Sequence, residues 1–307
     1  MIRYISARLL ATVPVVFGVT IAVFSMLYLI PGDPVKMMLS EFQTSPEQIA
    51  RMRAQLHLND PFLVQYGRFV WNGLHGNLGS SIRDNRPVTQ EIFEVLPQTA
   101  QLAVAALALS SVVGVTLGIV AALRQNSWMD VGAMMVATFG ISMPNFWLGL
   151  ILILLFSLRL EWLPAAGGGD LAHLVMPTLA LGLGAAAIVA RLTRSNMLDV
   201  LRMEYVNTAR AKGLGGGTVV MRHALLNALI PVITIFGLQF GALLAGTVFI
   251  ETVFGRPGLG RLAVDAIQNK DFPLVQGCVL VFALGYVFVN LLVDLAYAVI
   301  DPRIRYG

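Results

Sequence analysis

Long apolar stretches alternate with polar segments along almost the whole chain. Six of these stretches are near or above the length of about 20 residues that a transmembrane helix needs. They are approximately Leu9–Ile30, Gln98–Leu123, Val131–Leu158, Leu174–Ala190, Ala228–Ile250 and Phe272–Ile300. The fourth stretch is short, and it contains Pro177, Gly182 and Gly184, which disfavour a regular helix. The pattern predicts an all-α, polytopic membrane protein with six transmembrane helices.

The first apolar stretch follows Arg3 and Arg8, an arrangement that secretory signal peptides also show. It is longer than the apolar part of a signal peptide, and Pro31-Gly32-Asp33-Pro34 follows it in place of a small-residue cleavage site. We therefore expect residues 1–30 to be the N-terminus and a retained transmembrane helix.

The polar segment of residues 31–97 contains two helix-start signals. Ser45-Pro46-Glu47-Gln48 has the order of a capping box, with proline at the first helical position. Asn59-Asp60-Pro61 starts a second helix with four aromatic residues, namely Phe62, Tyr66, Phe69 and Trp71. We expect a small helical layer on the outer membrane surface. A contact surface for an extracytoplasmic partner is the alternative interpretation.

Composition agrees with a membrane protein. The 307 residues are 57% hydrophobic and only 12% charged, whereas soluble domains carry roughly 25% charge. The single cysteine, Cys278, lies in an apolar stretch and excludes a disulfide framework, and the four scattered histidines argue against a metal site. The net charge of +4 reflects where Lys and Arg lie, not a nucleic-acid partner; membrane lipid is the expected surrounding.

Lys and Arg are concentrated in the short segments that would share one side of the membrane with the N-terminus. These segments carry Arg3, Arg8, Arg124, Arg191, Arg194, Arg202, Arg210, Lys212, Arg222, Arg303 and Arg305. Short cytoplasmic segments are enriched in Lys and Arg in multi-pass proteins. We therefore expect both termini to be cytoplasmic.

The polar segment Glu204–Asn227, between the fourth and fifth stretches, has the pattern of two short helices. Glu204, Thr208 and Lys212 share one face of the first helix because they are spaced by four residues. Gly213 suits the left-handed position that ends a helix. The first helix therefore presents a polar face and stops at Gly213.

The second half of this segment begins with a glycine-rich turn, Gly215–Gly217. We expect Thr218 to cap a helix through Val219–Leu229. Two interpretations remain open for the basic residues Arg210 and Lys212. They either meet acidic groups on a soluble partner or only set the membrane topology.

Four separate stretches, in order along the chain, resemble one family. They are Leu29–Pro34 (LIPGDP), Tyr205–Leu214 with Arg222–Thr234 (YVNTARAKGL and RHALLNALIPVIT), Glu251–Phe254 with Pro257–Gly260 (ETVF and PGLG), and Asp301–Tyr306 (DPRIRY). The chain resembles permease subunits of binding-protein-dependent ABC importers of the peptide/opine/nickel family. It is most similar to the B-type dipeptide and glutathione permeases, which have a long segment after the first helix.

The resemblance implies a domain organisation and a function. Residues 31–97 would be an extracytoplasmic helical loop, residues 98–300 a five-helix permease core with a cytoplasmic coupling loop at 191–227, and residues 301–307 a cytoplasmic tail. The function implied is ATP-driven import of dipeptides, oligopeptides or glutathione across the bacterial inner membrane by alternating access. The partners implied are a second homologous permease, two ATP-binding subunits and an extracytoplasmic solute-binding protein.

The residues implied to transmit the ATPase stroke lie in and just after the first short helix: Glu204, Tyr205, Thr208, Ala209, Arg210, Lys212, Gly213 and Leu214. The segment departs from the general importer pattern EAA-x3-G-x9-I-x-LP, of which it keeps only Gly213, Ala209 and Leu225. Peptide permeases share this departure. We therefore expect Gly213, Thr208, Ala209 and Arg210 to matter more than Asn207.

The chain contains no phosphate-binding loop of the Gly-x4-Gly-Lys-Ser/Thr type. We therefore expect no ATPase site and no cofactor in this chain, with ATP and magnesium held by the partner ATPase subunits. An ion-coupled secondary carrier is the alternative function. It would need an acidic residue within the membrane, and Asp294 is the only plausible one; we expect Asp294 to pair with an arginine.

Polar residues within or next to the apolar stretches are candidates for a translocation pathway. Asn145 follows Pro144, a residue that bends helices, and Gln239 lies in the middle of the fifth stretch. Glu251 and Phe254 lie where that stretch ends, and the Glu251 carboxylate is suited to attract a peptide amino group. Hydrogen bonds between helices are the alternative role for Asn145 and Gln239.

Overall fold

The computed structural model describes residues 2–29, 45–55 and 59–300, and this part of the chain is almost entirely helical. The helices and two π-helical segments, η1 and η2, follow in the order α1 (Ile2–Leu29), α3 (Pro46–Gln55), α4 (Phe62–Leu74), α5 (Val88–Leu123), α6 (Trp128–Ser142), α7 (Asn145–Leu152), η1 (Ile153–Arg159), α8 (Ala172–Leu201), α9 (Glu204–Ala211), α10 (Gly216–Thr218), η2 (Val219–Ala224), α11 (Leu225–Val253), α12 (Leu259–Gln268) and α13 (Phe272–Ile300).

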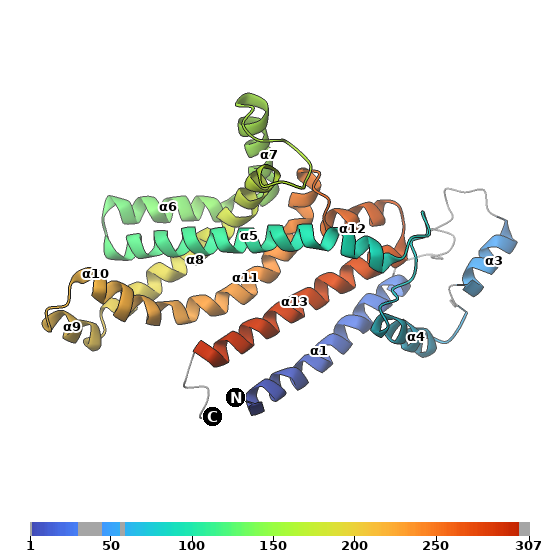
Figure 1. Ribbon diagram of the computed structural model, residues 1–307, viewed down its shortest axis with the longest axis horizontal. Coiled ribbons are helices and arrows are strands. Elements are labelled where there is room, and N and C mark those ends of the chain that lie inside the picture. Colours follow the sequence, from blue (N-terminus) through green and yellow to red (C-terminus); the bar gives the residue numbers. More distant parts are fainter. Residues whose placement is uncertain (1, 30–44, 56–58, 301–307) are drawn as a thin grey trace.

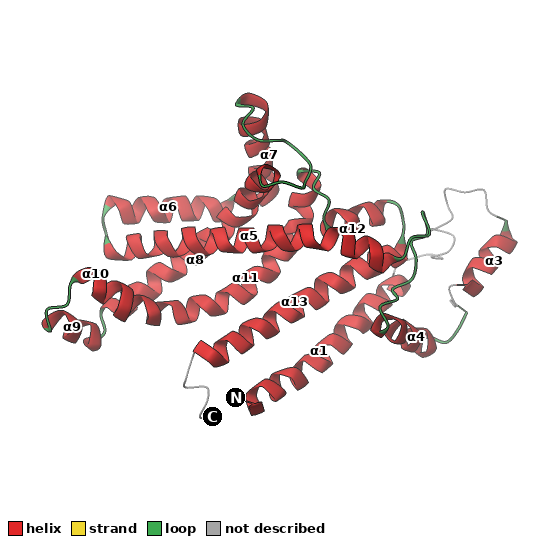
Figure 2. Ribbon diagram, viewed as in Figure 1, coloured by secondary structure: helices red, strands yellow, loops and turns green. Residues whose placement is uncertain are grey.

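The long helices form an elongated bundle (Figure 1). Helix α8 packs against α5, α6 and α11, and α13 packs against α1 and α11. Helices α9 and α10 lie at one end of the bundle, whereas α4 and α12 lie toward the other (Figure 1). Loops join the helices mostly at these ends and beside α7 (Figure 2). Helices α9 and α4 therefore lie at opposite ends of the bundle (Figure 1).

The prediction of several apolar spans is confirmed, with one correction. Five helices are long and apolar enough to cross a membrane, and the region predicted as the third span is a pair of helices bent by 102°. The bend lies at Met143 and Pro144, where α6 ends and α7 begins. Pro144 cannot continue the α6 hydrogen-bond ladder because it lacks a backbone N–H. The third span is therefore a broken one.

The predicted limits of other elements also need correction. Helix α8 continues to Leu201, eleven residues beyond the predicted end at Ala190. Pro177 lies near the start of α8 and does not interrupt it. The helical chain that leads into α11 begins at Gly216, with Gly215 at the N-cap position, so Thr218 does not cap it. The non-helical part of the predicted coupling loop is accordingly shorter than 191–227. Helix α13 begins and ends at the predicted residues.

The predicted helices after the first span are present as α3 and α4. Three aromatic rings of α4, on Phe62, Tyr66 and Phe69, surround Phe24 of α1 with ring centroids 5.2–5.6 Å apart. Tyr28 of α1 donates a hydrogen bond to Gln65 at 2.6 Å. Helix α4 is therefore fixed to the end of α1. Residues 30–34 and 301–306, which carry two of the family-like stretches, lie outside the described residues.

Close packing of α5 on α8 depends on small residues. A Cβ atom added at Gly114 would lie 2.6 Å from the Val189 Cβ, and one added at Gly118 would lie 2.5 Å from the Thr193 Cβ. Both distances are shorter than real Cβ contacts. The Gly114-x3-Gly118 spacing brings two helices into backbone contact, as small residues commonly do in membrane proteins.

A Gly118→Val substitution is expected to separate α5 from α8 and to lower the thermal midpoint of the detergent-solubilised protein strongly. The added Cβ would also lie 2.7 Å from the Ala190 carbonyl oxygen, which is backbone and cannot rotate away. Gly132→Val is the matched control, because a Cβ at Gly132 of α6 meets no atom within 4 Å. Equal thermal midpoints for the two variants would contradict this account of the packing.

Candidate coupling and translocation sites

Helix α9 is seated on the end of the bundle by a small apolar face. Val206 is fully buried and Ala209 is 7% exposed. Both pack into a cluster with residues from the end of α5, the end of α8, η2 and the start of α11, including Met197, Val219 and Leu225. A helix of eight residues is too short to be stable alone in water. Its position is therefore set by this seat.

Two hydrogen bonds of Tyr205 connect α9 to η2 and to the start of α11. The Asn227 side chain donates to the Tyr205 hydroxyl oxygen at 3.1 Å and to the His223 carbonyl at 3.0 Å. Tyr205 in turn donates to the His223 carbonyl at 3.5 Å. Polar contacts as well as the apolar seat therefore hold α9 against η2 and α11.

The end of α9 agrees with the sequence-based prediction. Gly213 has a φ of +78°, the left-handed conformation that glycine adopts without strain. Its N–H donates to the Arg210 carbonyl at 2.9 Å. Glycine at this position turns the chain sharply away from α9 toward α10.

Most of the residues expected to contact an ATPase lie on the exposed side of this structure. The exposed ones are Glu204, Tyr205, Thr208, Arg210, Lys212, Gly213 and Leu214. Ala209 differs, because its side chain faces the bundle. We therefore assign Ala209 to seating the helix and leave the contact role to the exposed face.

Asn145 and Gln239 lie on the same pocket, which has a volume of about 180 Å³ between α6, α7, α8 and α11. The Gln239 amide donates to the Ala185 carbonyl at 3.3 Å, so it also joins α11 to α8. Gly184 lines the same pocket. Two residues far apart in the sequence thus meet beside the Pro144 bend, and Gln239 makes an interhelical hydrogen bond there.

Glu251 and Phe254 do not face an open pathway. Glu251 is fully buried, and its carboxylate accepts hydrogen bonds from the Thr99 hydroxyl at 2.6 Å and from the Gly260 and Arg261 N–H groups at 2.7 and 3.2 Å. Phe254 is 2% exposed in the core. Contrary to expectation, Glu251 caps the start of α12 and is not available to a peptide amino group in this structure.

A second buried charge lies next to this carboxylate. Arg256 is fully buried and donates to the side-chain oxygens of Gln98 and Gln101 at 2.6 and 2.8 Å. Burial lowers the pKa of Arg256, and the negative charge of Glu251 opposes that change. The guanidinium remains charged because its ordinary pKa exceeds 12. The two charges join α5, α11 and α12 in one network.

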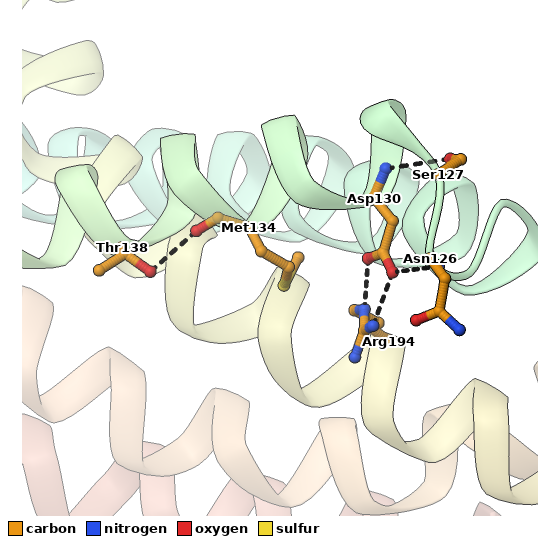
Figure 3. Close-up of polar contacts among 6 residues, drawn as sticks. All are labelled: Asn126, Ser127, Asp130, Met134, Thr138 and Arg194. Carbon is orange, nitrogen blue, oxygen red and sulfur yellow. Dashed lines mark hydrogen bonds and ion pairs between the residues drawn. The ribbon is translucent and has the colours of Figure 1, made fainter.

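An ion pair that sequence reasoning did not identify joins α6 to α8 (Figure 3). Arg194 donates from Nε and Nη2 to the two carboxylate oxygens of Asp130 at 2.6 and 2.7 Å. The Asn126 N–H donates to the same carboxylate at 3.0 Å, and Ser127 caps α6. The Ser127-x-x-Asp130 spacing is a helix-start signal. The sequence could therefore have placed Asp130 in the first turn of α6, but not its pairing with Arg194.

Asp294, the acid on which a secondary carrier would depend, is paired. Its carboxylate lies 3.3 Å from the Arg8 guanidinium, between α13 and α1. This agrees with the prediction that an arginine neutralises it. The described residues also contain no group of three or more His, Cys, Asp or Glu side chains that could hold a metal ion.

Comparison with known proteins gives the family. Residues 114–306 match the model of the binding-protein-dependent transport system inner membrane component, and residues 1–103 match the N-terminal model of the same membrane component. The chain is 43% identical to the dipeptide transport system permease protein of Alkalihalophilus pseudofirmus, with all of both chains covered. It is 41% identical to the glutathione transport system permease protein of Escherichia coli K12, again with both chains fully covered.

Solved structures show a similar fold. An inward-facing MetNI methionine ABC transporter matches with a TM-score of 0.58 at 15% identity, over 69% of this chain and 97% of the other. Homologous permeases of ABC importers lack an ATPase site, and family members work with ATP-binding subunits and a binding protein. The apolar helices and the family matches indicate a multi-pass protein of the bacterial inner membrane. The chain belongs to the family of binding-protein-dependent transport system inner membrane components, as a permease of an ABC importer.

Proposed function

We propose that this chain is the permease subunit of an ATP-driven importer for dipeptides, oligopeptides or glutathione, working by alternating access. The observation that carries the proposal is α9, a short helix whose apolar face is seated on the bundle and whose polar face is not covered by any described part of the chain. The relatives that match this chain over its full length are named as dipeptide and glutathione permeases, which supports the substrate class.

The proposed orientation places both termini and α9 in the cytoplasm. The distribution of Lys and Arg in the short segments supports it. The arrangement is consistent, since α9 and the turn between α5 and α6 lie at one end of the bundle and α4 lies toward the other (Figure 1). Helix α4 would then meet the extracytoplasmic binding protein.

The proposed mechanism transmits force through α9. ATP and magnesium bind the partner subunits, and closure of those subunits displaces the exposed face of α9. The apolar seat and the Asn227 and Tyr205 contacts pass the displacement to α8 and α11. The Asp130–Arg194 pair carries it from α8 to α6, and the break at Pro144 allows α6 and α7 to move relative to each other. Coupling of this kind requires a bundle with two stable arrangements.

A second homologous permease is proposed to complete the pathway. The pocket at Asn145 and Gln239 holds about 180 Å³, which is below the range of roughly 300–1,000 Å³ of typical ligand pockets. This pocket alone is therefore too small for a peptide, and the second permease is proposed to enlarge it. The two ATP-binding subunits and the binding protein complete the proposed assembly.

Uptake by right-side-out membrane vesicles tests the proposed function. Import of labelled dialanine or glutathione is expected to require ATP inside right-side-out vesicles together with the binding protein outside. It is expected to continue when an uncoupler removes the proton gradient. Uptake that persists without ATP and stops with the uncoupler would instead establish the ion-coupled carrier.

A further inference from the structure

A groove lies beside the Asp130–Arg194 ion pair, between α6 and α8. Its volume of about 640 Å³ lies within the range of roughly 300–1,000 Å³ that small-molecule sites occupy. One acid and one base contribute to its wall, so their charges cancel. The remaining wall is built from Asn126 and from apolar and hydroxyl side chains of α6.

Arg194 is held in a fixed pose with unused donors. Its Nε and Nη2 atoms form the two-pronged contact with Asp130, and no described residue accepts a hydrogen bond from Nη1. The Arg194 side chain is 25% exposed, whereas that of Asp130 is 4% exposed. Asp130 also accepts from the Asn126 N–H, so its oxygens are largely satisfied. The ion pair therefore offers a ligand the free N–H donors of the Arg194 guanidinium, whereas the Asp130 carboxylate oxygens are already used.

The part of the groove formed by α6 contains hydroxyl groups that can accept hydrogen bonds. Thr138 and Ser142 donate their hydroxyl hydrogens to the carbonyls of Met134 and Thr138 at 2.8 and 2.9 Å. Their oxygen lone pairs remain free to accept. Met134 and Thr138 lie on the same side of α6 as Asp130 (Figure 3), with apolar surface between the two polar positions.

The spacing of these groups suits a short peptide. Thr138 follows Asp130 by two helical turns, or about 12 Å along the α6 axis. An extended tripeptide spans about 10 Å. A peptide carboxylate on Arg194 therefore places the peptide amino end near Thr138, with its side chains against Met134, Met135 and Phe139, which line the groove.

From this geometry we propose that the α6–α8 groove binds the C-terminal carboxylate of a peptide at Arg194, with Asp130 positioning the guanidinium and the Thr138 hydroxyl accepting from the peptide's N–H donors. This inference rests on the proposed function and adds a substrate-binding residue to it. The groove runs along the length of α6, and the ion pair lies near the start of that helix. A site that requires a carboxylate binds free peptides in preference to peptide amides and cationic chelates.

Direct binding tests the site without the selectivity of the binding protein. The complex of both permeases and the ATP-binding subunits is placed in nanodiscs without nucleotide, and binding of radiolabelled trialanine and of trialanine amide is measured. The wild-type complex is expected to bind the amide about tenfold or more weakly, because a hydrogen bond to a charged group is lost. Arg194→Gln is expected to abolish this preference, while Arg191→Gln, an exposed change on the same helix, keeps it.

A second variant, which leaves the ion pair intact, keeps the test informative if the Arg194 variant does not fold. Met135 is 66% exposed, so Met135→Trp is expected to fold, to fill the groove and to weaken binding of both peptides. Equal binding of acid and amide by the wild type, or normal binding by Met135→Trp, would overturn the site. Continued ATP-driven dialanine uptake with either result would leave the proposed function standing, whereas no uptake and no binding by the wild type would remove both.

Discussion

Gly213→Pro is expected to abolish ATP-driven peptide uptake while the protein remains inserted in the membrane. Gly213 has a φ of +78°, whereas proline fixes φ near −65°. The change also removes the N–H that donates to the Arg210 carbonyl. Helix α9 would then end differently, and its exposed face would no longer be held at the same angle to the bundle. Uptake in proteoliposomes, compared with the amount of inserted protein, measures the effect.

Gly216→Pro is the matched control for this prediction. Gly216 is the first residue of α10, a position at which proline is favoured. Gly215 before it has a φ of −60° and a ψ of 143°, the conformation that a residue before proline adopts readily. We expect this variant to keep most of its uptake. Full uptake by the Gly213 variant, or equal loss in both, would contradict the assignment of α9 as the coupling helix.

Glu251→Ala is expected to destabilise the whole core more than any exposed substitution. It leaves the Thr99 hydroxyl and the Gly260 and Arg261 N–H groups without their acceptor, and it removes the negative charge next to the buried Arg256. Unsatisfied buried donors cost about 1–3 kcal/mol each, and a buried charge left alone costs a similar amount or more. We expect a loss of about 3 kcal/mol or more, measured as a lower thermal midpoint in detergent.

Glu94→Ala separates this effect from the general loss of a carboxylate. Glu94 is an exposed residue of α5 that pairs with Arg86 at 2.7 Å, and exposed pairs contribute little to stability. We expect its midpoint to stay near that of the wild type. A midpoint for Glu251→Ala that matches the Glu94 variant would show that the Glu251 network does not stabilise the core. Glu251 would then again be a candidate for contact with substrate.

The sequence predicted the parts of the fold that depend on local pattern. Helix α13 has the predicted limits because a long, mostly apolar stretch begins after Asp271. The end of α9 at Gly213 followed from the left-handed preference of glycine. The polar helix itself followed from residues spaced by four. Each of these signals lies within one turn or one continuous stretch of the chain.

The parts that were missed depend on contacts between distant segments. Glu251 and Thr99 are 152 positions apart, and Asp130 and Arg194 are 64 apart. Nothing in the local pattern showed that Glu251 turns toward the start of α12. A Cβ at Gly258 would lie 2.1 Å from the Glu251 carboxyl carbon, so the Pro-Gly-Leu-Gly stretch provides space for that carboxylate. The glycines had a packing role that only the assembled fold reveals.

The bend at Pro144 was also only half predicted. Proline indicated a change of direction, but a bend of 102° was not contained in the length or composition of the stretch. The size of a bend is set by how α6 and α7 pack against α8 and α11. For the same reason, the sequence named Asn145 and Gln239 as candidates without showing that they share a pocket.

Cross-linking from α9 tests the central claim most directly. Cys278 is the only cysteine and is fully buried, so a Thr208→Cys variant adds a single exposed thiol on α9. With a short thiol-to-amine cross-linker on native membranes, we predict that it joins the ATP-binding subunit. Asn77→Cys, on the exposed segment after α4, is predicted to give no such product. Cross-linking of the ATP-binding subunit to Asn77→Cys, with none to Thr208→Cys, would contradict the account.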